Sequence, residues 1–138
     1  MTPRPASKPS ANAPSLDSVF EELKAIVARY SKPFTVREGY VKNKRDYHLI
    51  LRKPLVIAGR KRDELWFASI IHQKHDVGFY YSPVYCDPKL GNGISPELLK
   101  HLDGKSCFHF TAMTAALKKD IDAALKLGLT DYKKKGWL

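Results

Sequence analysis

Apolar residues between Ser15 and Tyr30 recur every three or four positions, which is the period of one helix face. This stripe consists of Leu16, Val19, Phe20, Leu23, Ile26, Val27 and Tyr30. Ser15 is a good N-cap, and the nearby acidic residues suit the positive end of a helix dipole. Pro33 pushes Lys32 out of the helical conformation. The pattern predicts an amphipathic helix of about four turns.

Between residues 34 and 85 the pattern changes to that of β-strands. Residues 34–40, 47–51, 55–58 and 77–85 are rich in aromatic and β-branched side chains, and Pro54 requires an edge, a bulge or a break. Residues 65–71 are apolar on both faces, which indicates a central strand. Polar tips at 42–46, 59–63 and 73–76 separate these runs, so we expect an antiparallel meander. Its first and third tips would lie at one end of the sheet and its second at the other.

The last third of the chain predicts two helices and one more strand. Residues 87–93 have loop composition, and Ser95 with Pro96 is typical of a helix start. That short helix would end near Asp103 and Gly104, followed by a strand at 106–111. A final helix is expected from 114 to 127, with Gly128 as the residue that ends it. The order predicts an α+β fold, with about five antiparallel strands and both terminal helices on one face.

Length and charge limit the domain organisation and the partners. A chain of 138 residues makes one domain, expected at 15–132, between a disordered tail at 1–14 and a basic tail at 133–138. Four prolines and the lack of an apolar core argue against a targeting peptide in residues 1–14, and no apolar run approaches the ~20 residues of a membrane span. The net charge of +10 makes anions candidate partners. Cys86 and Cys107 lack a C-x-x-C spacing and read as reduced thiols, so we expect a cytoplasmic protein.

No catalytic or metal motif is complete. Gly104, Lys105 and Ser106 resemble the end of a P-loop, but Leu99 stands where that motif needs glycine. Cys107 and His109 share one face of a strand, yet i, i+2 neighbours stand ~7 Å apart, too far for a nucleophile and its base. A zinc site would combine these two with His72 and His75 across a hairpin, without an assured fourth ligand. We therefore expect no enzyme, no resident metal and no cofactor, with Cys107 the one plausible nucleophile if the protein is an enzyme.

Four stretches carry a family resemblance: residues 67–81 (FASIIHQKHDVGFYY), 83–85 (PVY), 94–100 (ISPELLK) and 104–110 (GKSCFHF). Together they resemble the YdhG-like family of small bacterial domains of unknown function. This resemblance implies a compact α+β domain with a curved antiparallel sheet and no established activity. Some members are described as frataxin-like iron chaperones, which bind iron through an acidic ridge on the first helix and strand. Here that region interleaves acidic and basic residues: Asp17, Glu21, Glu22 and Glu38 with Lys24, Arg29, Lys32 and Arg37.

Our leading hypothesis is a non-enzymatic YdhG-like binding domain for a small or anionic ligand or a protein partner, with a homodimer as one form of partner. Cationic and amphipathic residues around the central hairpin form the candidate ligand site, namely Trp66, Lys74, Phe79, Tyr81, Lys105 and His109. A frataxin-like iron chaperone is the first alternative. The second is a nucleic-acid-binding domain, which would combine the basic tips with exposed aromatic side chains.

Overall fold

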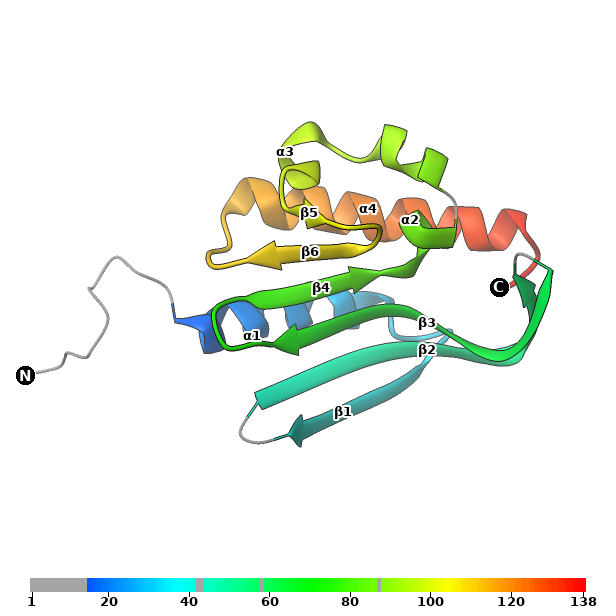
Figure 1. Cartoon of the computed structure of the whole chain (residues 1–138), viewed down its shortest axis with the longest axis horizontal. Helices are drawn as coiled ribbons and strands as arrows, with labels where there is room; N and C mark the ends of the chain where they lie inside the picture. The colour runs from blue at the N-terminus through cyan, green and yellow to red at the C-terminus, as the bar shows by residue number, and fades with distance from the viewer. Residues whose placement is uncertain (1–14, 42–43, 58, 87) are drawn as a thin grey trace, which may run out of the picture.

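The computed structural model describes residues 15–41, 44–57, 59–86 and 88–138. These form a six-stranded antiparallel sheet, with two long helices packed on the same face (Figure 1). The α+β class and the one-sided helical cover are confirmed, with six strands where about five were expected. The predicted tail at 1–14 lies outside the described residues.

The first helix, α1 (Leu16–Val27), forms as the periodicity predicts. The Ser15 hydroxyl accepts a hydrogen bond from the Ser18 amide at 3.0 Å and so caps the helix. Its apolar stripe is buried at Val19, Phe20, Leu23, Ile26 and Val27. Full burial of each such side chain contributes roughly 1.5–3 kcal/mol. A 3₁₀ turn, Ala28–Tyr30, ends the helical segment before Pro33.

Four consecutive strands form the predicted meander: β1 (Thr35–Val41), β2 (Lys44–Ile57), β3 (Arg60–His72) and β4 (Val77–Tyr81). The β1–β2 and β3–β4 turns lie at one end of the sheet and the β2–β3 turn, at Gly59, lies at the other (Figure 1). Pro54 lies inside β2, where the pairing register shifts between Arg52 and Leu55. Pro54 was expected at an edge, a bulge or a break, and it lies at an irregularity in the pairing of one continuous strand.

The segment after β4 differs from the prediction. The expected strand at 77–85 ends at Tyr81, and residues 82–86 form a short helix, α2 (Ser82–Cys86), followed by a 3₁₀ turn at Pro88–Gly93. Helix α3 (Pro96–Leu99) begins after the Ser95 cap as predicted. It leads into an unpredicted edge strand, β5 (Leu102–Asp103), which pairs with β6 (Cys107–Phe110). Gly104, with φ of +80°, makes the turn between them, so the P-loop resemblance belongs to a hairpin.

The last helix, α4 (Ala115–Lys134), runs seven residues beyond the predicted end at Leu127. Gly128 lies inside the helix, and the C-terminal glycine with positive φ is Gly136. The expected basic tail at 133–138 is therefore partly helical and packed. Trp137 contacts the buried Tyr132 ring, and the Lys53 ammonium donates to the Trp137 carbonyl at 2.9 Å. The prediction that Gly128 ends the helix was wrong because glycine is needed there for another reason: a Cβ atom at 128 would collide with Tyr81 and Pro83.

The core lies between the sheet and the helices α1 and α4. Its largest side chains include Phe20, Phe67, Phe79, Tyr81 and Phe108, all fully buried. Phe67 contacts the rings of Tyr81 and Tyr132, which joins the sheet to α4. In the part of the chain that the structure describes, none of the helices is long and apolar enough to cross a bilayer.

Candidate functional site

The sheet face that α1 and α4 leave uncovered carries a continuous row of side chains. Residues paired across neighbouring strands point to the same side of a sheet. The pairings therefore place one residue from each strand in a single row: Arg37, His48, Ser69, Tyr80, Cys107 and Asp103. Parallel to this row run Asp46, Ile71, Gly78 and His109 on one side, and Thr35, Ile50 and Trp66 on the other. We call this surface the open face.

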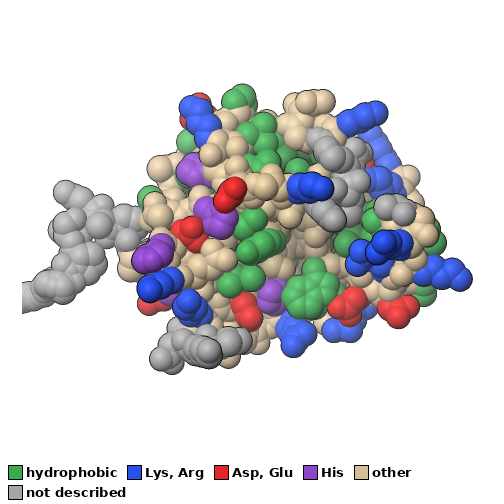
Figure 2. Space-filling model, in the orientation of Figure 1, with side chains coloured by type: hydrophobic (Ala, Val, Ile, Leu, Met, Phe, Trp, Pro, Cys, Tyr) green, Lys and Arg blue, Asp and Glu red, His purple; other side chains and the backbone are tan. Residues whose placement is uncertain are grey.

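Figure 2 shows the open face, with hydrophobic side chains across its centre and both signs of charge around them. Trp66 is half-buried there, and its ring meets the His48 ring edge-on at 4.6 Å. The Arg37 guanidinium lies 5.8 Å from the Trp66 ring centroid, and the indole N–H donates to Glu64 at 2.6 Å. Ile50, the strand partner of Trp66, is fully buried although neither α1 nor α4 packs on this side. The large side chains of the open face thus shield one another from water.

Asp46, His48 and Ser69 form a constellation that resembles a catalytic triad. His48 Nδ1 is 2.7 Å from the Ser69 hydroxyl, and its Nε2 is 3.6 Å from an Asp46 carboxylate oxygen. Burial lowers the pKa of His48, while the Asp46 charge partly opposes this shift. Ser69 is buried, and its backbone belongs to a strand paired on both sides, so its amide is committed to the sheet and not to an oxyanion. The arrangement serves to satisfy a buried histidine rather than to drive acyl transfer.

The Cys107 thiol and His109 do not form a nucleophile and base pair. His109 Nδ1 lies 3.1 Å from Asp76, and its Nε2 lies 3.9 Å from Asp103, so both ring nitrogens face carboxylates. Burial is the main cause that raises the pKa of Cys107, and the nearby acidic residues add to it. The thiol therefore stays protonated near neutral pH, which disfavours attack by a thiolate. Cys107 is a free cysteine, and the side chain of Cys86 lies outside the described part of the chain.

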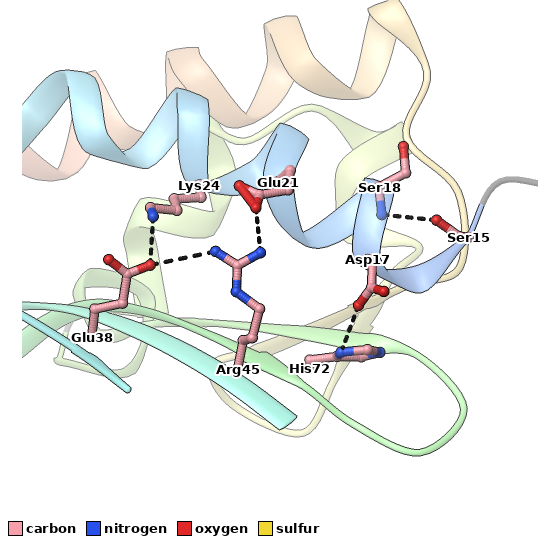
Figure 3. Close-up of polar contacts among 8 residues, drawn as sticks. All are labelled: Ser15, Asp17, Ser18, Glu21, Lys24, Glu38, Arg45 and His72. Atoms are coloured by element: carbon pink, nitrogen blue, oxygen red, sulfur yellow. Dashed lines mark hydrogen bonds and ion pairs between the residues drawn. The ribbon is translucent and has the colours of Figure 1, made fainter. Parts of the chain in front are cut away.

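The hypothetical zinc ligands are divided between the two faces of the sheet. Cys107 and His109 lie on the open face, whereas His72 turns toward α1 and stands 3.4 Å from Asp17 (Figure 3). Within residues 15–41, 44–57, 59–86 and 88–138, no three His, Cys, Asp or Glu side chains converge as a metal site would require.

The carboxylates of the first helix and first strand are engaged with basic partners (Figure 3). Arg45 reaches from β2 to both Glu21 and Glu38, and Lys24 pairs with the same Glu38. Glu22 pairs with Lys118 of α4. The bond from Arg45 is the main cause that lowers the pKa of Glu21. Carboxylates held by arginine and lysine are poor ligands for a hard cation such as iron, because binding would first have to break these pairs.

The predicted site residues do not form one site. Trp66 and His109 lie on the open face, on strands separated by β4. Phe79 and Tyr81 are fully buried beneath the helices, so they belong to the core. Lys74 and Lys105 are exposed in turns beyond opposite ends of β4 and β6, so they do not converge on a common anion.

Sequence reasoning missed three residues of the open face, Arg37, His48 and Tyr80. The signal was present in β2, where Asp46, His48 and Ile50 alternate with the core residues Tyr47, Leu49 and Leu51. Tyr80 likewise stands between the two buried rings of β4. A comparison of this chain with protein-family models, with curated proteins and with solved structures found no match.

Proposed function

We propose that this chain is a non-enzymatic, YdhG-like binding domain that docks a protein partner on its open face. The observation that carries the proposal is Trp66, half-buried on an uncovered sheet face and in contact with both Arg37 and His48. Tryptophan, tyrosine and arginine are the residues that dominate the energetics of protein interfaces, with a polar rim around them. Tyr80, which lies in the same row as Arg37 and His48, adds a second aromatic ring to the open face.

A protein partner fits this face better than a small anion does. The open face spans all six strands and mixes Arg37 with Asp46, Asp76 and Asp103. A small anionic ligand would favour convergent cations, and the two lysines first considered lie at opposite ends of the central strands. A rim with both signs of charge instead suits a protein interface, where complementary charges on the two partners fix how they dock.

A second copy of this chain is a poor partner, since two molecules of net charge +10 repel each other. The excess charge favours a partner of net negative charge and would accelerate its association. An iron chaperone has less support, because the carboxylates of α1 and β1 are held in ion pairs. The free Cys107 thiol supports a cytoplasmic location for this interaction.

Site-specific photocrosslinking in cells of the source organism tests the proposal. A benzophenone amino acid replaces Arg37, which is exposed beside Trp66, and a matched variant carries it at the exposed Lys119 of α4. We expect an adduct of defined mass from position 37 and not from position 119. With the identified partner purified, Trp66→Ala should weaken binding by about 30-fold or more, whereas Trp66→Phe should weaken it less.

Equal adducts from both positions, or none from position 37, would refute the proposal. An adduct of twice the mass of the chain would replace the acidic partner with a homodimer. Unchanged affinity of Trp66→Ala for the identified partner would move the interface away from the open face.

A further inference from the structure

Several cations at one end of the molecule are paired with carboxylates, whereas a group of cations at the other end is not. At the end formed by α1 and the β1–β2 hairpin, Lys24, Arg45 and Lys118 each face a carboxylate. At the opposite end lie the β2–β3 hairpin and the last turn of α4, joined by the bond from Lys53 to the Trp137 carbonyl. Lysine and arginine side chains gather there, at the right of Figure 2.

Five cations define this second surface, which we call the basic end: Arg60, Lys61, Arg62, Lys133 and Lys134. All five are exposed, and none lies within ion-pair distance of a carboxylate among the residues that the structure describes. Two neighbouring cations do have acidic partners, Arg52 with Glu64 and Lys135 with Asp131, so these two carboxylates are not available to the five cations. Exposed cations such as Lys44, Lys74 and Lys119 also lie elsewhere on the surface, but the basic end brings five together on two neighbouring segments.

We propose that the basic end binds the phosphodiester backbone of nucleic acid. Phosphates attract clustered lysine and arginine without any need for base contacts, and release of counterions from the polymer supplies the affinity. Lys61 and Arg62 also line a hollow of about 290 Å³ with Pro54, Leu55, Val56 and Asp63. Its two cations outnumber its one carboxylate, so the lining carries a net positive charge that suits a backbone phosphate.

The distribution of the side chains favours nucleic acid over an anionic membrane. Lys61 pairs with Val56 on one side of the β2–β3 ribbon, while Arg60 and Arg62 pair with Ile57 and Leu55 on the other. The cations therefore surround the ribbon, whereas a flat lipid surface would engage one side. Membrane-surface binding also relies on inserted apolar side chains. The exposed Val56, at 61%, could insert into a lipid surface, but the larger Trp137 ring is not available for insertion because it packs against Tyr132.

An acidic protein is also a weaker fit to the basic end than nucleic acid is. Protein interfaces draw most of their energy from well-packed aromatic anchors at their centre. The five residues of the basic end are all cations, and the open face, where Trp66 lies, is a different surface. The two proposals are independent, because the basic end can bind nucleic acid whether or not Trp66 recognises a partner.

Fluorescence anisotropy with a labelled 30-base-pair DNA duplex and the matching single strand, between 50 and 200 mM salt, tests the inference. Five phosphate contacts predict a slope of log K against log salt of about −4.5 for the duplex, and a loss of several-hundred-fold in affinity over this range. The triple variant R60Q/K61Q/R62Q should reduce the slope by about 3, and K133Q/K134Q by about 2.

A matched variant, K100Q/K118Q/K126Q, removes the same net charge from lysines that are ion-paired elsewhere on the surface. It should leave the slope nearly unchanged. The inference would be overturned by equal losses in the two triple variants, by a salt-independent affinity, or by no binding at 50 mM salt. It would also be overturned if phosphatidylserine vesicles or polyglutamate bound more tightly than either nucleic acid. All exchanged side chains are exposed except Lys118, which is partly buried, so circular dichroism should match the wild-type protein and Tm should stay close to it.

Discussion

Gly128 gives the sharpest test of the packing between α4 and the sheet. A Cβ atom at this position would lie 2.2 Å from the Tyr81 hydroxyl oxygen and 2.8 Å from Pro83 Cγ. Tyr81 has no room to withdraw, since it is fully buried and its hydroxyl donates to the Ala124 carbonyl. The Gly128→Ala substitution therefore forces a backbone or side-chain shift in the centre of the core.

Two opposing effects decide the result. Alanine is favoured over glycine inside a helix by about 1 kcal/mol, whereas overpacking of a tight core costs about 1–3 kcal/mol and occasionally more. With contacts this short we expect the overpacking to exceed the gain, with a net loss of about 1–2 kcal/mol in the free energy of unfolding. For a chain of this size that loss lowers Tm by roughly 3–8 °C.

Thr130→Ala is the matched control, because residue 130 lies in the same helix but is exposed. It should stabilise the protein by a few tenths of a kcal/mol through helix propensity alone. Tyr81→Phe removes the nearest clashing atom, so Gly128→Ala should cost at least ~1 kcal/mol less in that background, as a double-mutant cycle from urea unfolding would show. A rise in Tm for Gly128→Ala like that of the control would show that the helix accommodates a Cβ at this position without overpacking.

Three further predictions concern polar groups. Because burial lowers the pKa of His48, the unfolded chain takes up a proton there more readily, so stability holds above about pH 7 and declines as pH falls from about 6.5. His48→Gln should flatten the urea-unfolding profile between pH 7.5 and 5, and an unchanged slope would contradict this. Burial, followed by the hydrogen bond to Asp122, raises the pKa of Tyr30 to about 12. The phenolate absorbance of Tyr30 at 295 nm, taken as the difference from Tyr30→Phe, should therefore be small at pH 11 and larger in Asp122→Asn, where burial alone still raises the pKa; an equal absorbance would contradict this. Arg45→Lys should lower the free energy of unfolding by about 1 kcal/mol in urea titrations, because one ammonium group cannot pair with Glu21 and Glu38 at once as the guanidinium does. Equal stability of the two proteins would show that these ion pairs do not stabilise the fold.

The helices and most strands could be predicted because their signals are local. The apolar stripe of α1 and the Ser95–Pro96 start of α3 depend only on neighbours in sequence. Residues 82–86 and Gly128 were misassigned because tertiary contacts override local rules. Pro83 and Val84 are buried within a helical turn, and Gly128 serves the close approach of Tyr81 rather than the end of a helix.

The candidate site was harder to predict because it depends on strand register. The pairing shifts by one residue between Leu49 and Ile50, so that Ile50 lies opposite Trp66 instead of Phe67. That bulge turns Phe67 into the core and leaves Trp66 on the open face. No pattern in residues 65–71, which are apolar throughout, distinguishes these two outcomes. Composition could name Trp66 as a candidate, but it could not choose its face.

The position of Trp66 also couples recognition to stability. The indole shields His48 and Ile50 on the face that α1 and α4 leave uncovered, so its removal exposes both and costs stability even without a partner. A core deletion such as Phe67→Leu would lower stability without altering the open face, since Phe67 packs against Phe34 and Tyr132. If recognition resides in Trp66, its alanine variant must lose affinity at temperatures where both variants are fully folded, while Phe67→Leu keeps it. Equal losses in the two would mean that the partner senses only the stability of the sheet.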